Sequence, residues 1–366
     1  MAYARVETVG ILTAGGDCPG LNAVLRAFVR TSARTATWKI LGIPDGYEGL
    51  VNDAPFRTLD GDAVRGILPR GGTILGTSNR CNPFAVRHTV DGELTVTDES
   101  EKAVAKLRAH DVDVLVVVGG DGSLGVGLQL QRQYSIPVVG IPKTIDNDLS
   151  STDITFGFDT AVATATDALD KLHSTAESHH RVMILEVMGR NAGWIALESG
   201  LAGGADIIVI PEIPFRVERI AEAILERGRR GIHFSMLVAA EGARPVGGEP
   251  ILAQRVGPDG YPRLGGIGAW LVEQLSQHVG YEVRATVLGH LQRGGSPSPF
   301  DRVLASRLGA HAVLLVGAGD FGKMVGVRGL EIVPVPIEHA VGVQKLVPPC
   351  GERVMTARHL GIAFGD

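Results

Sequence analysis

Short apolar runs alternate with amphipathic stretches along the chain, and this alternation predicts the fold class. The runs are apolar throughout instead of alternating with polar residues, which is typical of parallel strands buried on both faces. Stretches such as 21–32 and 159–176 have the apolar spacing of helices. The predicted strands are 9–13, 113–118, 137–141, 182–187, 207–210, 235–240 and 284–288. The pattern therefore predicts an α/β protein of the doubly wound type.

Glycine is the residue type whose placement changes this picture most. The chain has 366 residues, enough for about two domains, and 49 of them are glycine. The glycines cluster after the apolar runs, notably in 14–20, 119–127 and 188–193. Glycine lets the backbone approach a ligand closely, and open α/β sheets bind ligands at the carboxyl ends of their strands. We therefore expect the functional site in these loops.

Charge and cysteine content exclude several classes of protein. The balance of 35 basic to 40 acidic residues argues against general nucleic-acid binding. No apolar run approaches the roughly 20 residues that span a membrane, and residues 1–9 lack the features of a secretory signal. Cys18, Cys81 and Cys350 are too far apart to suggest a zinc site or a disulfide framework. We expect a cytoplasmic protein.

Two glycine motifs are candidates for phosphate binding. The first, GGDCPG at 15–20, follows a strand and opens a helix, so it is either an anion site or a tight structural turn. The second, GGDGS at 119–123, follows the strongest predicted strand. Here Asp121 could hold Mg²⁺, or Ser123 could simply cap the helix.

Acidic and basic residues accompany the other strand ends. In PKTIDND at 142–148, Asp146 and Asp148 share one side of an extended segment and could divide proton removal and metal contact, unless the segment is a solvated turn. Arginines suit a phosphorylated substrate when they converge on one cleft, although any one of them could be a surface ion pair. The basic candidates are Arg181, Arg190, Arg284, His290 and Arg293. Together these residues are typical of phosphoryl transfer to a sugar phosphate.

At this point the chain resembles the 6-phosphofructokinase family. The motifs LTAGGDCPGLN, GGDGS, PKTIDND, TFGFDTA, EVMGRNAGWIAL, AEG and GHLQRGGSPSPFDR stand in the family's order within residues 9–302. Residues 304–366 carry no motif. The resemblance implies MgATP and fructose 6-phosphate as substrates, Mg²⁺ as cofactor, and a glycolytic reaction giving fructose 1,6-bisphosphate.

The resemblance also implies roles for individual residues. Asp146 is the base for the 1-hydroxyl and is grouped with Thr144 and Arg190 as catalytic, and Asp121 binds Mg²⁺. The nucleotide positions are Gly16, Arg80, Cys81, Gly120, Asp121, Gly122 and Ser123. The sugar-phosphate positions are Thr144, Asp146, Arg181, Met188, Gly189, Arg190, Glu241, Arg284, His290 and Arg293. Arg181 and Arg284 reach in from a neighbouring subunit, which implies a homotetramer or homodimer.

The implied architecture is two doubly wound three-layer domains with the active site in the cleft between them. Residues 1–157 plus about 292–343 form the nucleotide-binding domain, and residues 158–291 plus about 344–366 form the fructose-6-phosphate-binding domain.

Two residues bear on the phosphoryl donor. Gly122 has no side chain and leaves room for the α-phosphate of ATP, whereas an aspartate there, as in pyrophosphate-dependent relatives, would fill that space. Lys143 replaces a glycine that is usual in short ATP-dependent enzymes and could hold pyrophosphate, but we expect its side chain to be mobile enough to swing aside. We therefore predict ATP, with pyrophosphate as the alternative.

Two other classes of protein make different demands on the sequence. A kinase acting on NAD or a lipid shares GGDG but lacks TIDND and the arginines. A non-catalytic nucleotide sensor is expected to have lost Asp121 or Asp146, and both are present.

Overall fold

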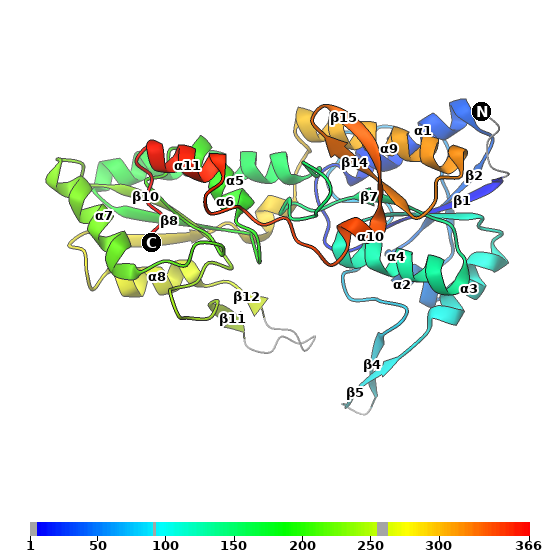
Figure 1. Cartoon of the computed structure of the whole chain (residues 1–366), viewed down its shortest axis with the longest axis horizontal. Coiled ribbons are helices and arrows are strands. Elements are labelled where there is room, and N and C mark those ends of the chain that lie inside the picture. The colour runs from blue at the N-terminus through cyan, green and yellow to red at the C-terminus, as the bar shows by residue number, and fades with distance from the viewer. Residues whose placement is uncertain (1–5, 91–92, 255–262) are drawn as a thin grey trace. The chain divides into compact units, whose positions relative to one another are not determined.

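Residues 6–90, 93–254 and 263–366 are described by a computed structural model, shown in Figure 1. Contacts divide the chain into two units. Unit 1 comprises Met1–Ile145, Leu149–Asp159 and Arg293–Gln344, and unit 2 comprises Asp146–Asp148, Thr160–Gln292 and Lys345–Asp366. Each unit holds a largely parallel sheet with helices on its faces, which confirms the predicted α/β class. That one unit binds nucleotide and the other sugar phosphate stays a prediction.

Unit 1 is built on a seven-stranded sheet with the order β15-β14-β7-β6-β1-β2-β3. Its strands are β1 (Thr8–Thr13), β2 (Lys39–Ile43), β3 (Arg57–Thr58), β6 (Val114–Gly119), β7 (Val138–Pro142), β14 (Lys323–Arg328) and β15 (Glu331–Pro336). The five inner strands are parallel, and β3 and β15 are antiparallel at the two edges. All residues of β1, β6 and β7 are buried, as their continuous apolar runs predict.

Helices cover both faces of this sheet (Figure 1). The helices of unit 1 are α1 (Leu21–Thr35), α2 (Glu48–Val51), α3 (Ser100–Ala109), α4 (Asp121–Tyr134), α9 (Pro299–Ala318) and α10 (Ile337–Ala340). In Figure 1, α1 and α9 pack together above the sheet, and α2, α3 and α4 lie below it. The predicted loop 119–127 is wrong beyond Gly120, because α4 begins at Asp121 and its glycines are helical.

Unit 2 is built on a smaller parallel sheet with the order β13-β8-β10-β9. Its strands are β8 (Val182–Val187), β9 (Ile207–Val209), β10 (Ser235–Ala240) and β13 (Val283–Val287). Its helices are α5 (Phe158–His179), α6 (Trp194–Ala202), α7 (Val217–Arg229), α8 (Ile267–Leu275), η1 (Gly289–Arg293, a 3₁₀ helix) and α11 (Glu352–His359). In Figure 1, α5, α6 and α11 lie on one face, and α7 and α8 pack on the other. None of the described helices is both long and apolar enough to cross a membrane.

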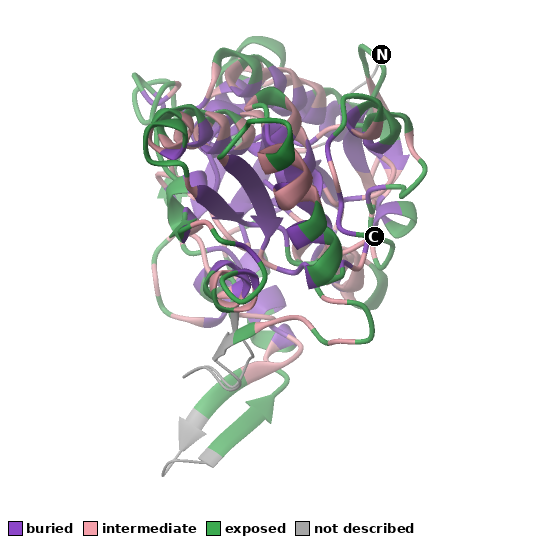
Figure 2. Cartoon of the chain, turned by 90° about the vertical axis from the view of Figure 1, so that its left-hand side faces the viewer, coloured by how far each residue is buried: buried purple, intermediate pink, exposed green. Residues whose placement is uncertain are grey.

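Strand β13 departs from its predicted burial. Only Val283 is buried, and the four residues that follow it in the strand are exposed. The physical reason is position, since β13 is an edge strand of the four-stranded sheet and its outer side has no neighbouring strand among the described residues. The buried strands of unit 2 between their helices are seen in Figure 2.

Two short hairpins complete the fold. They pair β4 (Val86–Val90) with β5 (Glu93–Thr97), and β11 (Leu252–Gln254) with β12 (Arg263–Leu264). The described side chains of β5 are exposed (Figure 2).

Candidate active site

Two glycine loops start side by side at the carboxyl ends of β1 and β6. These strands are parallel neighbours, with Thr13 opposite Val118. The strand order reverses here, because β2 lies on one side of β1 while β6 and β7 lie on the other. Such a switch point is where open α/β sheets bind ligands. A Cβ on Gly15 would lie 3.4 Å from Ser123 Oγ, so the two loops are in contact.

The two helices that follow these loops differ in the accessibility of their N-termini. Residues 18–20 are buried, and a Cβ on Gly20 would lie 2.7 Å from the ring of Phe156, so the first turn of α1 is packed against protein. In contrast, α4 has Gly120 as its N-cap, and Gly122 is exposed with no atom within 4 Å of a Cβ position. The amides of the first turn of α4 are therefore the ones placed to bind an anion.

This arrangement answers the alternatives left open for the two motifs. For GGDCPG, the last three residues form a packed turn, and only residues 15–17 are partly exposed. For GGDGS, Ser123 lies inside the first turn of α4, and α4 has no side-chain cap. The capping interpretation of Ser123 is thus wrong.

Lys143 lies between the two loops in a fixed position. Its side chain is buried, at 5% exposure, and Nζ donates a hydrogen bond to Gly16 O at 2.5 Å. Its backbone N–H donates to Gly119 O at 2.9 Å. The expected mobility of Lys143 is therefore wrong, because burial and the hydrogen bond to Gly16 hold the ammonium in place.

Arg293 lies beside the same loop. Its Nη1 donates to Asp17 O at 3.2 Å, and a Cβ on Gly16 would approach that nitrogen to 2.6 Å. A residue predicted for the sugar phosphate is thus in contact with the loop predicted for the nucleotide.

Residues 77–81 flank the first glycine loop. Gly15 N–H donates to Ser78 O at 3.0 Å. The exposed Arg80 follows Ser78 by two residues. Cys81 is partly buried against the core of unit 1. Burial, with smaller contributions from Glu48 and Glu99, raises the pKa of the Cys81 thiol to about 11. Cys81 therefore stays a thiol at neutral pH and offers a ligand an apolar contact.

In unit 2, two loops interlock at the carboxyl ends of β8 and β10. The first carries Met188, Gly189 and Arg190, and the second carries Glu241. Glu241 N–H donates to Val187 O at 2.8 Å, and the next residue, Gly242, donates to Gly189 O at 3.1 Å. Gly189 has φ of 140°, which favours glycine. A Cβ on Gly242 would lie 1.9 Å from Arg190 O, so no other residue fits there without a shift.

A buried glutamine that the sequence analysis missed ties these loops to η1. Gln292 is fully buried, its Oε1 accepts from Met188 N–H at 3.3 Å, and its Nε2 donates to Gly289 O at 3.1 Å. The exposed His290 lies in the same 3₁₀ helix.

Arg181 and Arg284 are not with the other basic candidates. Arg181 precedes β8 and Met188 follows it, so a strand of about 20 Å separates them. Arg284 lies on the parallel neighbour β13. It pairs with Met183 of β8 and is therefore at the same amino end as Arg181. Within this unit, Arg181 and Arg284 therefore do not converge with Arg190 on one cleft, because the whole of β8 lies between Arg181 and Arg190.

Glu282, also missed by the sequence analysis, holds these two arginines together. Arg181 Nε donates to one carboxylate oxygen at 2.5 Å, and Arg284 Nε donates to the other at 2.7 Å. The hydrogen bonds from Arg181 and then Arg284 hold the pKa of Glu282 below its usual range. The result is a pair of cations fixed around one carboxylate at the amino end of the sheet.

The comparisons with known proteins agree with the motifs. The family model described as "Phosphofructokinase" matches residues 8–316. A curated protein of Chloroflexus aurantiacus, "ATP-dependent 6-phosphofructokinase", is 52% identical over 364 residues, covering 99% of each chain. The chain belongs to the phosphofructokinase family. The resemblance inferred from the motifs is confirmed.

Other phosphofructokinase relatives differ in donor and in length. The "Pyrophosphate--fructose 6-phosphate 1-phosphotransferase" of Streptomyces coelicolor is 50% identical, covering 98% of this chain and 99% of its own. The crystal structure of Pichia pastoris phosphofructokinase in the T-state has a TM-score of 0.77 and 31% identity. It is matched over 92% of this chain and 36% of that one, so this chain spans about a third of its length.

The relatives named for ATP and for pyrophosphate are 52% and 50% identical to this chain, so overall similarity does not decide the donor.

The residues of this phosphofructokinase are compatible with Mg²⁺. No group of three or more His, Cys, Asp or Glu side chains that could enclose a metal occurs among the described residues. Mg²⁺ does not need one, since it commonly binds one or two carboxylates together with substrate phosphates and water. Asp121 begins α4 next to the exposed Gly122, and one of its oxygens accepts from Gly342 N–H at 2.7 Å.

Proposed function

We propose that this phosphofructokinase transfers the γ-phosphoryl group of MgATP to the 1-hydroxyl of fructose 6-phosphate, giving ADP and fructose 1,6-bisphosphate in glycolysis. The observation that carries the proposal is the first turn of α4 at the switch point of the unit 1 sheet, where Gly122 is exposed and its neighbours are partly exposed. Gly120, Asp121, Gly122 and Ser123 form this turn, and Gly16 lies in the adjoining loop. Backbone amides at such a turn bind phosphates.

ATP is the proposed donor because of the space at Gly122. Nothing lies within 4 Å of a Cβ position there, so the α-phosphate of a nucleotide can approach the backbone. Arg80 and Cys81 flank the neighbouring loop and are the proposed contacts for the rest of the nucleotide.

Pyrophosphate is the alternative donor, and Lys143 is the observation that favours it. Its ammonium is buried among the loops that would receive phosphate, 3.3 Å from a Cβ position on Gly15. We rank it second because Nζ is already engaged by Gly16 O.

Asp146 is the proposed base. The 1-hydroxyl of the sugar has a high pKa, so its proton must go to a positioned carboxylate as the oxygen attacks the γ-phosphorus. The new O–P bond forms, the bond to the β-phosphate oxygen breaks, and ADP leaves with the electron pair. Thr144 orients the acceptor, and the Arg190 guanidinium stabilises the negative charge on the phosphoryl group during transfer. Mg²⁺ bound at Asp121 would neutralise charge on the donor phosphates.

The sugar phosphate is assigned to the loops at the strand ends of unit 2 and to their neighbours in the chain. These residues are Thr144, Asp146, Met188, Gly189, Arg190, Glu241, His290 and Arg293. Arg181 and Arg284 lie about 20 Å away along β8, and we propose that they serve the site of a second copy of the chain. This proposal requires a homodimer or homotetramer. We place the enzyme in the cytoplasm, where its free cysteines stay reduced.

Purified protein assayed with fructose 6-phosphate and Mg²⁺ tests the proposal. Matched reactions contain ATP or pyrophosphate, and other sugar phosphates and NAD serve as acceptor controls. We expect fructose 1,6-bisphosphate to form with ATP. Phosphorylation of another acceptor, with fructose 6-phosphate untouched, would overturn the proposal.

A further inference from the structure

The C-terminal segment, which carries no motif, contacts the residues next to Asp146. Lys345 begins the last segment of unit 2, and Asp146–Asp148 belongs to the same unit. The backbone N–H of Lys345 donates to Asp148 O at 2.7 Å. Its Nζ donates to Asn147 Oδ1 at 2.9 Å. Lys345 therefore binds both residues that follow Asp146.

The turn at Asn147 is one that needs support. Asn147 has φ of 51°, in the left-handed region, which asparagine tolerates better than most residues but which still persists only where the surroundings hold it. Its side chain is only 2% exposed, and a buried amide must be hydrogen-bonded. The Lys345 ammonium supplies a charged donor to the amide oxygen, and charge-assisted bonds are stronger than neutral ones.

Lys345 is itself fixed to the first residue of α6. Trp194 Nε1 donates to Lys345 O at 2.7 Å. The Lys345 ammonium lies 6.0 Å from the centre of the indole ring, and the Arg353 guanidinium lies 5.5 Å from it, both within the range of cation–π attraction. Because α6 follows the loop of Met188 and Arg190, Lys345 connects that loop to the turn of Asp146.

Glu212 anchors the segment two residues further on. Its carboxylate accepts from Val347 N–H at 2.8 Å and from Gly193 N–H at 3.0 Å. Burial raises the pKa of Glu212, and these amide bonds oppose the shift. The carboxylate thus joins the segment to the residue that precedes α6.

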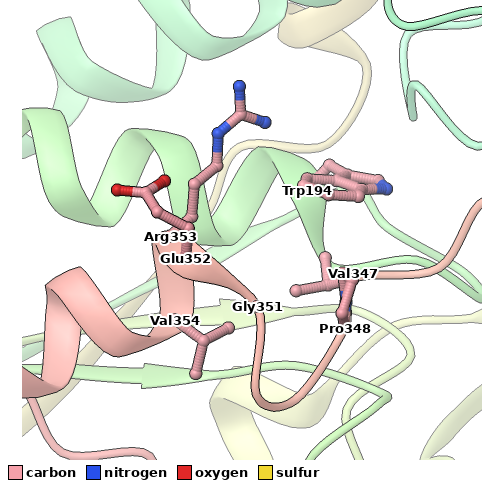
Figure 3. A pocket seen from close by; sticks show the side chains of 7 residues that line it. All are labelled: Trp194, Val347, Pro348, Gly351, Glu352, Arg353 and Val354. Carbon is pink, nitrogen blue, oxygen red and sulfur yellow. The ribbon is translucent and has the colours of Figure 1, made fainter.

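A pocket lies beside the segment, although Val347, which lines it, is itself only 1% exposed. The pocket has a volume of about 230 Å³. Figure 3 shows its lining side chains, with Val347 and Pro348 next to the ring of Trp194 and Arg353 on the helix that follows.

We propose that Lys345 is a positioning residue for Asp146, holding the turn of Asn147 and Asp148 so that the carboxylate meets the acceptor hydroxyl. This inference rests on the proposed function, in which Asp146 is the base. Displacement of a reacting group by about 1 Å can cost a hundredfold in rate.

Steady-state kinetics of Lys345→Met test the inference. The variant keeps the length of the side chain and removes its charge and donors. We expect kcat to fall about 10- to 100-fold, with the KM values for ATP and fructose 6-phosphate changed less than about threefold. Lys345→Arg should restore part of kcat. Lys171→Met removes an exposed lysine of the same unit and should match the wild type. A kcat within twofold of wild type for folded Lys345→Met would overturn the inference.

Amide hydrogen exchange gives a readout independent of the reaction. In Lys345→Met, peptides covering residues 145–149 should exchange faster, whereas those of β8 should not change. Trp194→Phe removes the donor to Lys345 O and should produce a smaller effect of the same kind. Unchanged exchange in both variants would overturn the positioning role. A wild-type protein with no activity on fructose 6-phosphate would refute the proposed function but not, by itself, the positioning role.

Discussion

At the residue scale, the proposed chemistry depends on the carboxylate of Asp146. Asp146→Asn keeps the shape of the side chain and removes the base, so turnover should fall roughly 10²- to 10⁴-fold, the usual effect of losing general-base catalysis. KM values should change little, because the contacts of the bound substrates remain. Initial rates over a range of both substrates measure this. Asp167→Asn on the exposed face of α5 is the matched control, and a near wild-type rate for Asp146→Asn would remove Asp146 from the mechanism.

Gly122 is the residue that separates the two donors. A Cβ there meets nothing within 4 Å, so Gly122→Ala should fold normally and keep much of its activity with ATP. Gly122→Asp adds a carboxylate next to the phosphates and should lower kcat/KM for ATP at least tenfold, about 1.4 kcal/mol or more. Equal ATP kinetics for the two variants would show that the donor phosphates do not approach this turn.

Local motifs identify candidate residues, but they do not predict what surrounds those residues in the fold. Asp121, Asp146 and Gly122 are recognisable from their motifs, which are local. The burial of Lys143 was not predictable, because it depends on Gly16, which is distant in sequence and is brought near by the pairing of β1 with β6 and of β6 with β7.

At the scale of elements, the loop after β10 fits against the loop after β8 only because Gly242 lacks a side chain. Gly242→Ala would place a Cβ 1.9 Å from Arg190 O, so the loop carrying Arg190 must move. We expect a loss of roughly 1–3 kcal/mol in the free energy of unfolding, as for other overpacked sites, and a raised KM for fructose 6-phosphate. Denaturant unfolding and steady-state kinetics measure the two effects. Gly280→Ala, where the space is open, is the control and should leave both unchanged.

The arginine pair at the amino end of β8 and β13 should depend on Glu282. Glu282→Gln removes the charge between Arg181 and Arg284 and should raise the KM for fructose 6-phosphate about two- to fivefold, the size expected of an exposed pair, with kcat unchanged.

This effect has a defined pH dependence. Because the pKa of Glu282 is lowered, its carboxylate stays ionised from neutral pH down through the usual range of glutamate, and the bridge is lost only as pH falls through the lowered pKa. The ratio of the two KM values should therefore be constant from about pH 6 to 8. A ratio that falls to one within this window would contradict the assignment.

The strands of the two sheets were predictable where burial is continuous, as in β6 and β8. The exposure of β13 was not, because strand order decides which strand forms an edge. The same holds for the opposite placement of Arg181 and Arg190, which are close in sequence but separated by the length of β8. Contacts made by Lys345 were hidden too, since they join residues about 200 positions apart.

At the scale of the whole molecule, the proposal that Arg284 serves the site of a second copy of the chain can be tested by mixing two variants. At a concentration of fructose 6-phosphate well below the wild-type KM, Arg284→Ala and Asp146→Asn proteins should each have little activity alone. When the two are dissociated together and reassembled, random pairing makes half of the dimers mixed, and each mixed dimer has one intact site of two. We expect about one quarter of wild-type activity. Mixed dimers shown by native mass spectrometry, without regained activity, would mean that each site is built within one chain.

The measurement that tests the account most directly follows the phosphoryl group itself. ATP labelled with ³²P at the γ-position is incubated with the protein, Mg²⁺ and fructose 6-phosphate. The sugar products are then separated, and the carbon position that carries the labelled phosphate is identified. We predict label on the 1-position of fructose 1,6-bisphosphate, with no transfer by Asp146→Asn above about one hundredth of the wild-type rate. Label found only in inorganic phosphate, or bisphosphate formed only when pyrophosphate replaces ATP, would contradict it.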